Sequence, residues 1–497
     1  MPTIKTIDPV TRLEGHLKIE VTIDTIGGVQ KVVDARATGT LFRGFESILV
    51  NRDLGDAQHI TERICGVCPV SHGLASVLAQ DALTQTVVTN NARVMRNVVL
   101  ASNFVQSHIL HFYHLAVQDY VDGPAMPPWQ PSWSSDKRLD AATTTRLVGN
   151  YVKALEKRRQ AHEMAALFGG RMPHPPALVG GGMTSAVTAA RVASLKAYVA
   201  QLIPFITDTY LPDVTLLASK YPDYYSIGRG HGSLLAFGVF DQNQTGSSKL
   251  LKRGRVVNGS TTVQAVDVNA ITESVKASWY AAAGDGLKPA AGVTTPQYPK
   301  SGAYSWLKAP RYSGAPYEVG PLARMWVNGD YRRGISVMDR HAARAQEALK
   351  IAQAIQSWTG QLAVNGSAYT QPRVPTTTRS AYGLTEAPRG ALGHWVQATA
   401  GRIDRYQIIT PTCWNASPRD GAGVRGPLEQ ALVGTPVRTI GEPVEVLRVI
   451  HSFDPCLSCA VHVMRPGDQA DIKQLEPATV FSVEHTHGPG EHRRHAH

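Results

Sequence analysis

Alternating apolar and polar positions near the start of the chain predict a β-hairpin. Residues 17–23 alternate apolar and polar side chains, residues 29–37 continue as a partner strand, and Gly27-Gly28 supplies the turn between them. Shorter β-like runs at 406–409 and 444–449 alternate with turn residues over 402–450. We therefore expect small β elements at both ends of the chain.

Apolar residues that recur every three or four positions predict helices through the middle of the chain. Ser71 is the expected N-cap of a helix that continues to Leu83. Asn90 or Asn91 is the expected N-cap of a longer helix that reaches about Val121. Further helices are expected at about 145–168, 186–220 and 336–360, with loops and short strands over 222–333. This pattern favours a single, mainly α unit with small β elements.

Composition narrows the functional classes. The chain has 497 residues, 43% of them hydrophobic, and a formal charge of +11. Its Lys and Arg residues form no dense basic run of the kind typical of nucleic-acid binding, so we expect no nucleic-acid partner. The sequence has no uninterrupted apolar stretch of spanning length, and its first residues lack the apolar segment of a secretory signal. Membrane contact or export is therefore expected only through partners.

Four of the five cysteines form two CxxC pairs, Cys65/Cys68 and Cys456/Cys459. A CxxC pair can present two thiolates to one metal ion, and four thiolates suit soft metals such as zinc, nickel or iron. Zinc ribbons usually keep their pairs within a few tens of residues, whereas these pairs lie near opposite ends of the chain. The spacing alone supports a structural zinc site and a buried catalytic metal about equally, with transient disulfide chemistry as a minor third interpretation.

Polar residues beside the pairs favour a working site. His72 follows Cys68 by about one helical turn, Asp454 precedes Cys456, and His462 follows Cys459 by three positions. A structural zinc site needs none of these groups, whereas a centre that moves protons needs several.

The motifs around these residues resemble those of nickel-iron hydrogenase large subunits. The matching segments, in order along the chain, are RLEGH at 12–16, FRGFE at 42–46, RICGVCPVSHG at 63–73, QSHILHFYH at 106–114, FGGRMPH at 168–174, EVGPLAR at 318–324, APRG at 387–390, PTCWN at 411–415 and DPCLSCAVH at 454–462. The resemblance implies a fold of long central helices around a buried binuclear metal site and an enzyme that reversibly cleaves H2 into protons and electrons.

The resemblance also implies roles for the cysteines. Cys65 and Cys456 would be terminal nickel ligands, while Cys68 and Cys459 would bridge nickel to an iron that carries carbon monoxide and cyanide. Glu14 would accept the proton from Cys456. Taken from the residues alone, Glu14 would more simply be an ion-pair partner for Arg12.

Further residues acquire roles in the same way. Arg389 would lie over the open coordination site and meet a cyanide, although an Arg after a proline turn is ordinarily a surface residue. Thr412 would hydrogen-bond the other cyanide, and His72 and Asp454 would support the ligands. A second set, Glu46, His462 and the backbone near Ile408, would hold magnesium or a similar divalent cation.

The sequence departs from the pattern at some positions. Ser107 stands where many relatives carry Asp, so a charged partner for Arg389 is expected to be missing. The segments around 106–111 and 323–327 are most similar to the selenium-containing branch, in which the position of Cys456 is selenocysteine. Cys413 is not required by the pattern, and a small buried residue is its expected role.

The resemblance implies partners as well. Because the chain has no spare cysteines for iron–sulfur clusters, electrons would leave through an iron–sulfur small subunit in a heterodimer. Such small subunits often carry the export signal, which predicts a periplasmic or membrane-associated complex, with a cytoplasmic location as the alternative. Nickel-insertion factors and a maturation endopeptidase would bind transiently.

The domain prediction follows from that processing. Residues 1–462 would form the catalytic unit, and 463–497 a C-terminal extension removed during maturation. The extension carries a histidine cluster at His485, His487, His492, His495 and His497. In the simpler interpretation, the cluster belongs to a solvated tail or a purification tag. In the more specific one, it binds nickel transiently during maturation.

Two other functions compete with the hydrogenase. One is the metal-free quinone-site subunit of the complex I type, which lacks the cysteine pairs that this chain retains. The other is a scaffold protein stapled by a four-cysteine zinc site, which metal analysis would distinguish.

Overall fold

The computed structural model describes residues 2–12, 15–130 and 132–456. The predicted hairpin is present as β2 (Leu17–Ile26) and β3 (Val29–Gly39), and β1 (Thr3–Ile7) extends it in the order β1-β2-β3. Every second residue of β2 from Leu17 to Ile23 is buried, as the alternation predicts.

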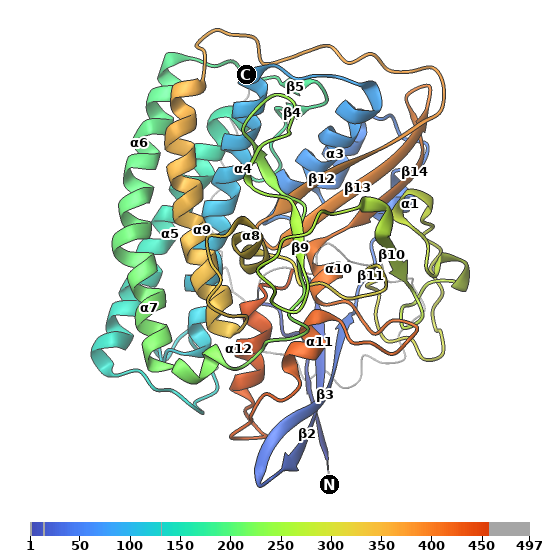
Figure 1. Ribbon diagram of the computed structural model, residues 1–497. Helices are drawn as coiled ribbons and strands as arrows, with labels where there is room; N and C mark the ends of the chain where they lie inside the picture. Colours follow the sequence, from blue (N-terminus) through green and yellow to red (C-terminus); the bar gives the residue numbers. More distant parts are fainter. Residues whose placement is uncertain (1, 13–14, 131, 457–497) are drawn as a thin grey trace, which may run out of the picture. The chain divides into compact units, whose positions relative to one another are not determined.

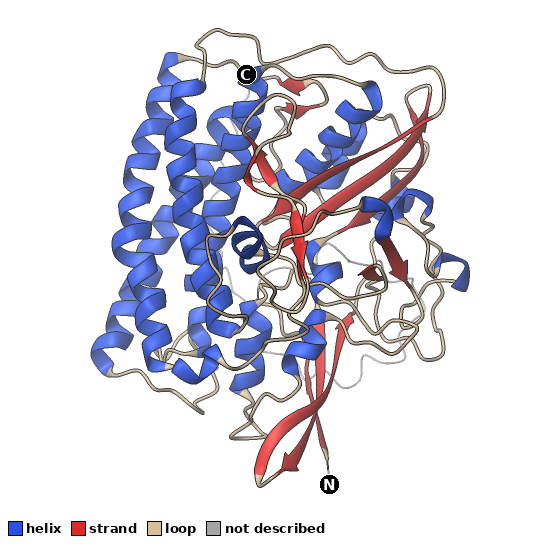
Figure 2. Cartoon of the chain, viewed as in Figure 1, coloured by secondary structure: helices blue, strands red, loops and turns tan. Residues whose placement is uncertain are grey.

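Long helices form one side of the described chain (Figures 1 and 2). They are α4 (Asn90–Leu110), α5 (Ala141–Gly169), α6 (Ala189–Phe205), α7 (Leu211–Lys220) and α9 (Val337–Trp358), while the long helix α3 (Pro69–Thr84) lies apart from this group. The almost wholly buried α4 packs against α5 and α9, while α6 packs against both α5 and α9. The sequence therefore predicted the main helices correctly.

The helix starts differ from the prediction by a few residues. Thr89, rather than Asn90 or Asn91, caps α4, and its hydroxyl accepts a hydrogen bond from the amide of Ala92. Asn91 instead bonds the backbone of Ala363 through both its amide nitrogen and its carbonyl oxygen. Ser71 lies inside α3, which begins at Pro69 because proline needs no amide hydrogen bond in the first turn.

Two of the predicted helices continue through π-helical turns. After α4 the chain forms η1 (His111–Ala116), a π-helix, and then η2 (Val117–Asp119), a 3-10 turn. The single helix expected over 186–220 is α6 and α7 joined by the π-helical η3 (Ile206–Tyr210). π-helical turns often occur at functional sites, and His111 of η1 lies beside Cys456.

A three-stranded antiparallel sheet of β12 (Arg379–Ala387), β13 (Gly390–Thr399) and β14 (Arg402–Ile409) packs against α3. The run at 406–409 is thus a strand. The β interpretation of 444–449 was wrong, because these residues form α12 (Val444–Ser452), whose buried Val446, Val449 and Ile450 follow helical spacing. Short apolar runs do not by themselves distinguish the two structures.

The remaining elements are short. The helices are α1 (Phe45–Ile48), α2 (Asp56–Glu62), α8 (Pro321–Asn328), α10 (Pro411–Asn415) and α11 (Pro427–Leu432). The strands are β4 (Leu178–Val179), β5 (Gly182–Met183), β6 (Leu234–Ala236), β7 (Val239–Asp241), β8 (Lys249–Leu251), β9 (Gly254–Val256), β10 (Ile271–Ser274) and β11 (Ala309–Tyr312). The 3-10 turns are η4 (Pro222–Tyr225), η5 (Val268–Ala270), η6 (Ala282–Gly284), η7 (Pro289–Ala291) and η8 (Thr359–Gln361). Within 222–333, α8 was not anticipated.

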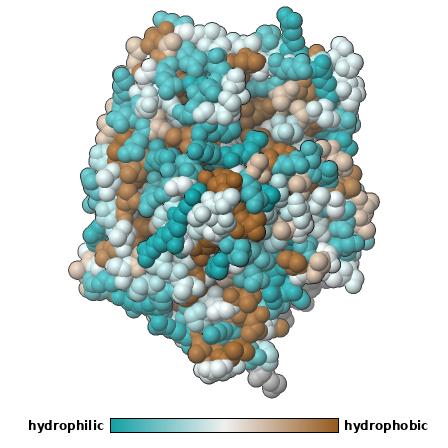
Figure 3. Space-filling model, viewed as in Figure 1, coloured by the Kyte–Doolittle hydropathy of each residue, from teal (hydrophilic) through white to brown (hydrophobic). Residues whose placement is uncertain are grey.

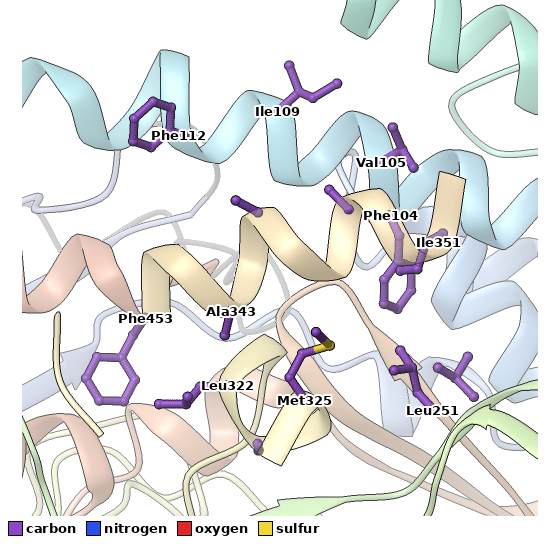
Figure 4. Close-up of a cluster of buried hydrophobic side chains, with 14 of the residues drawn as sticks. Phe104, Val105, Ile109, Phe112, Leu251, Leu322, Met325, Ala343, Ile351 and Phe453 are labelled. Carbon is purple, nitrogen blue, oxygen red and sulfur yellow. The ribbon is translucent and has the colours of Figure 1, made fainter. Parts of the chain in front are cut away.

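The main apolar core joins the helices to this mixed region. In Figure 4, α9 lies between α4 and α8, and Phe104, Ile351 and Met325 from the three helices share one buried cluster. The face in Figure 3 is a mosaic of hydrophilic and hydrophobic residues. Among the described helices, none combines the length and apolar character needed to cross a membrane.

Candidate metal centre

The first cysteine pair lies in the loop between α2 and α3. Cys68 is the N-cap residue of α3, where the helix dipole stabilises negative charge, and the amide of Cys68 donates to the sulfur of Cys65 at 3.2 Å. Asn103 and Gln106 of α4 hold the loop by donating to the carbonyl of Val67, at 2.8 and 3.2 Å. The long central helix thus fixes the position of both thiols.

The second pair begins where α12 ends. Asp454 turns the chain through a left-handed conformation, at φ 55°, that Asp tolerates better than most residues. The amide of Cys456 then donates to the hydroxyl of Thr412 on α10 at 3.3 Å. As a result, the sulfurs of Cys65 and Cys456, separated by 391 positions in the sequence, lie 3.5 Å apart.

Cys65, Cys68 and Cys456 form one buried cluster, each at most 2% exposed. Cys459 lies outside the described residues, as do Glu14 and His462. Within the described part of the chain, no group of three or more His, Cys, Asp or Glu side chains is by itself arranged to hold a metal ion. Three soft sulfur donors in a dry cluster nevertheless fit a nickel or iron site.

Arg389 lies beside this cluster rather than on the surface, and only 3% of it is exposed. Its Nε donates to the carbonyl of Asp454 at 2.9 Å, and its Nη2 lies 3.0 Å from Oδ1 of the same residue. Burial alone would lower the pKa of Arg389, but Asp454 and the nearby thiols of Cys456 and Cys68 raise it well above its ordinary value. The guanidinium is thus held in its charged form next to the thiols.

Because Ser107 is uncharged, Arg389 was expected to lack a charged partner at that position. Asp454 supplies a charged partner instead. Its own pKa is raised to about 6 by burial, against the lowering effect of Arg389. Ser107 is fully buried on α4, and its hydroxyl has no hydrogen-bond partner among the described residues. Arg389 therefore has a charged partner, Asp454, although Ser107 does not supply one.

His72 is fully buried on α3 and begins a chain of polar groups. Its Nδ1 lies 3.2 Å from Nε2 of His394, whose Nδ1 lies 2.8 Å from the hydroxyl of Tyr406. Burial lowers the pKa of His72 to about 3, although the nearby Cys456 acts in the opposite direction. His72 is therefore a neutral imidazole that can support a thiolate without competing for its charge.

A small cavity of about 10 Å³ adjoins Cys456. Its lining residues are Thr11, Arg12, His111, Leu115, Arg389, His451, Asp454, Pro455 and Cys456. This volume is on the scale of a single small molecule such as water. Neither His111 nor His451 was predicted to lie at the site, although His111 belongs to the QSHILHFYH motif.

The N-terminal segment beside this cavity is held by ionic contacts. Arg12 donates to the carbonyl of Leu115 at 2.6 Å and pairs with Asp119. His451 lies 2.6 Å from Asp119 and 3.0 Å from the carbonyl of Val10. Within the described residues, the ionic partner of Arg12 is therefore Asp119.

The second predicted site surrounds Glu46. One carboxylate oxygen of Glu46 accepts from the amide of Ile408 at 2.8 Å, and the other lies 3.4 Å from the ammonium of Lys308. Burial lowers the pKa of Lys308, but Glu273 and Glu46 outweigh it and keep the group protonated. A cavity of about 60 Å³ lies against these residues. Cys413 also lines it, and burial raises the pKa of this thiol to about 11.

The model of the nickel-dependent hydrogenase family matches residues 43–131, 126–334 and 328–462. The periplasmic [NiFeSe] hydrogenase large subunit of Desulfomicrobium baculatum is 43% identical, with 92% of this chain and 94% of that protein covered. The Hydrogenase-2 large chain of Escherichia coli K12 is 32% identical, at 92% and 97% coverage. The reduced Ni-Fe-Se hydrogenase of Desulfovibrio vulgaris Hildenborough superimposes with a TM-score of 0.89 and 43% identity, covering 93% of this chain and all of that one.

Proposed function

This chain belongs to the nickel-dependent hydrogenase family, and from that premise we propose how its own residues hold and serve the metal centre. It is the catalytic large subunit of a nickel-iron hydrogenase, as the sequence motifs indicated, and it has the mainly α fold of that family. The family requires nickel and iron; the ligand set is our proposal.

In this proposal Cys65 and Cys456 would hold the nickel, and Cys68 and Cys459 would hold the nickel and iron together. The observation that carries the proposal is the 3.5 Å approach of the Cys65 and Cys456 sulfurs from opposite ends of the chain. A structural zinc site would not need the buried Arg389 and Asp454 beside it, since unneeded buried charges are costly.

Iron in this centre would carry carbon monoxide and cyanide. Nη1 of Arg389 has no hydrogen-bond partner among the described residues, and a buried donor of this kind normally has an acceptor. A cyanide nitrogen would supply one. Thr412 accepts from the amide of Cys456, which leaves its hydroxyl hydrogen available for the second cyanide.

When bound, the nickel–iron pair supplies the electron acceptor that heterolytic cleavage of H2 requires. The protein supplies the base and the proton path. The thiolate of Cys456, in the small cavity with His111 and Arg389, would take the proton at its sulfur, and Glu14 would carry it away. Arg389, held in place by Asp454, would keep a fixed positive charge over the reacting molecule in a site that excludes bulk water.

Glu46, the backbone at Ile408 and His462 would form the second, magnesium site. Mg²⁺ prefers oxygen ligands and keeps several of its waters. The cavity of about 60 Å³ has room for such waters, and the Glu46 and Glu273 carboxylates give it negative charge. Lys308 partly neutralises that charge, so a hydrated ion bound through few direct protein ligands fits best.

An iron–sulfur small subunit would receive the electrons. The proposal also places the complex in the periplasm, as the name of the Desulfomicrobium baculatum relative states for that protein. A maturation endopeptidase would cut after His462 once nickel-insertion factors have loaded the site, leaving 1–462 as the catalytic unit.

Metal analysis with infrared spectroscopy of the purified complex tests the ligand set. We expect nickel, iron in excess of nickel because the iron–sulfur small subunit also carries iron, and absorption bands of bound carbon monoxide and cyanide. Zinc without nickel would contradict the proposal and favour the scaffold interpretation. A protein without any of these metals would favour the quinone-site alternative, although that class lacks the cysteine pairs found here.

A further inference from the structure

Arg324 of the EVGPLAR motif lies fully buried on α8, and all five of its N–H groups are used. Two of them bind the carboxylate of Glu347, from Nε at 2.6 Å and from Nη2 at 2.7 Å. The other three reach consecutive residues of one turn: Glu386 at 2.8 Å, the carbonyl of Ala387 at 2.9 Å and the carbonyl of Pro388 at 2.8 Å.

This turn joins β12 to β13, and the next residue is Arg389. We propose that Arg324 is a positioning residue, which acts through the 386–388 backbone to fix where the Arg389 guanidinium lies at the metal centre. The inference rests on the proposed role of Arg389 and goes beyond it, because Arg324 is not part of the thiol cluster or its cavity.

The anchor itself is rigid. Glu347 belongs to α9 and also binds Nε2 of His108 on α4 at 2.8 Å, so the clamp is tied to two core helices. Glu386 uses its second oxygen to accept from the amide of Phe237 at 2.6 Å. Burial raises the pKa of Glu347, but Arg324 and His108 outweigh it and lower the pKa to about 2. The anchoring carboxylate is therefore charged at any working pH.

Val319 and Gly320 also confine this turn. A Cβ atom at Gly390 would lie 2.4 Å from Val319 Cγ2, and one at Gly320 would lie 3.1 Å from the carbonyl oxygen of Arg389. The Glu318–Arg324 motif thus packs directly against Arg389 at one end and clamps the residues before it at the other. Lysine could not replace Arg324, since an ammonium has three donors and no planar fork.

The test is a double-variant cycle in the purified large–small subunit complex. Arg324→Lys should lower H2 turnover by about 10²-fold, the cost of a displacement of about 1 Å, with nickel and iron content unchanged. In an Arg389→Lys background, Arg324→Lys should cause no further loss, because its effect passes through Arg389. If the loss of turnover in the double variant equals the product of the two single-variant losses, the proposal is wrong.

Arg311→Lys is the matched control. Arg311 is another buried Arg that binds one carboxylate, that of Asp420, and donates to backbone carbonyls, including those of Pro418 and Val424. Its loss should lower stability without changing turnover per nickel. An equal loss of turnover in both variants would mean that Arg324 has only a general structural role.

Hydrogen exchange of the amides over 385–390 gives a readout independent of activity. Arg324→Lys should increase exchange in this segment, and Arg311→Lys should not. If Arg324→Lys does not assemble, Glu386→Gln removes one anchor and should show the same pattern more weakly. Unchanged exchange would refute the clamp, whereas wild-type turnover in Arg389→Lys would refute the proposed role of Arg389 alone.

Discussion

Replacing Asp454 by Asn tests whether the buried ion pair with Arg389 serves catalysis. The two side chains are 3.0 Å apart and 3% and 1% exposed, so the change leaves Arg389 charged, buried and without its counterion. Breaking such a pair from one side costs about 3–5 kcal/mol of stability. Nε of Arg389 still reaches the backbone carbonyl of residue 454, so the protein should assemble with a misdirected guanidinium.

We expect turnover per nickel to fall, approaching the roughly 10²-fold that a displacement of about 1 Å costs. The assay is H2 oxidation and isotope exchange at pH 8, where a carboxyl with a pKa of about 6 is ionised in the wild type. Thermal unfolding of the same preparations measures the loss of stability separately.

Asp420→Asn is the matched control, because Asp420 pairs with the buried Arg311 at 2.7 Å, with side chains 3% and 9% exposed. It should cost similar stability and leave turnover per nickel unchanged. Wild-type turnover in Asp454→Asn, or the same loss in both variants, would refute the assignment of this pair to the centre.

Three further predictions follow from individual residues. Glu14→Gln should give a metal-loaded enzyme in which exchange between D2 and water falls by roughly 10²–10⁴-fold; unchanged exchange would show that Glu14 is not the relay. Burial raises the pKa of Glu62 from 4.5 to about 8, so the native state keeps a proton that the unfolded chain releases. The free energy of unfolding should therefore fall by about 5 kcal/mol as pH rises from about 4.5 to 8, and Glu62→Gln should lack this component; identical pH profiles would refute it. The intact mass of active enzyme should correspond to a chain that ends at His462. Active protein that retains residues up to 497 would refute the proposed processing. Normal nickel loading after deletion of 485–497 would refute only the proposed nickel-binding role of the tail.

The sequence predicted those parts of the fold that depend on local periodicity. The alternation over 17–23 is clear because one face of β2 is buried and the other is partly exposed. The helical spacing over 90–110 could be detected although α4 is almost wholly buried. β13 was not predicted, since its first seven residues are all buried and no alternation remains to mark a strand. The π-helical turn at 111–116 has no comparable sequence signal, although it places His111 beside the site.

The candidate site could be predicted only where motifs were present. Spacing alone left zinc and a catalytic metal equally supported. An Arg after a proline turn would ordinarily lie on the surface, whereas Arg389 is buried. The partners Asp454–Arg389 and Arg324–Pro388 join segments far apart in the sequence, and no local pattern indicates such contacts. Only the folded chain brings them together.

The metal content of two cysteine variants tests the central claim most directly. Cys456→Ser replaces a proposed nickel ligand by a harder and weaker donor, while Cys413→Ser changes the one cysteine outside the proposed set. We predict that Cys456→Ser contains no stably bound nickel and does not activate hydrogen, and that Cys413→Ser retains the nickel content and hydrogen activation of the wild type. Full nickel content and activity in Cys456→Ser would contradict the assignment of the metal centre to these cysteines.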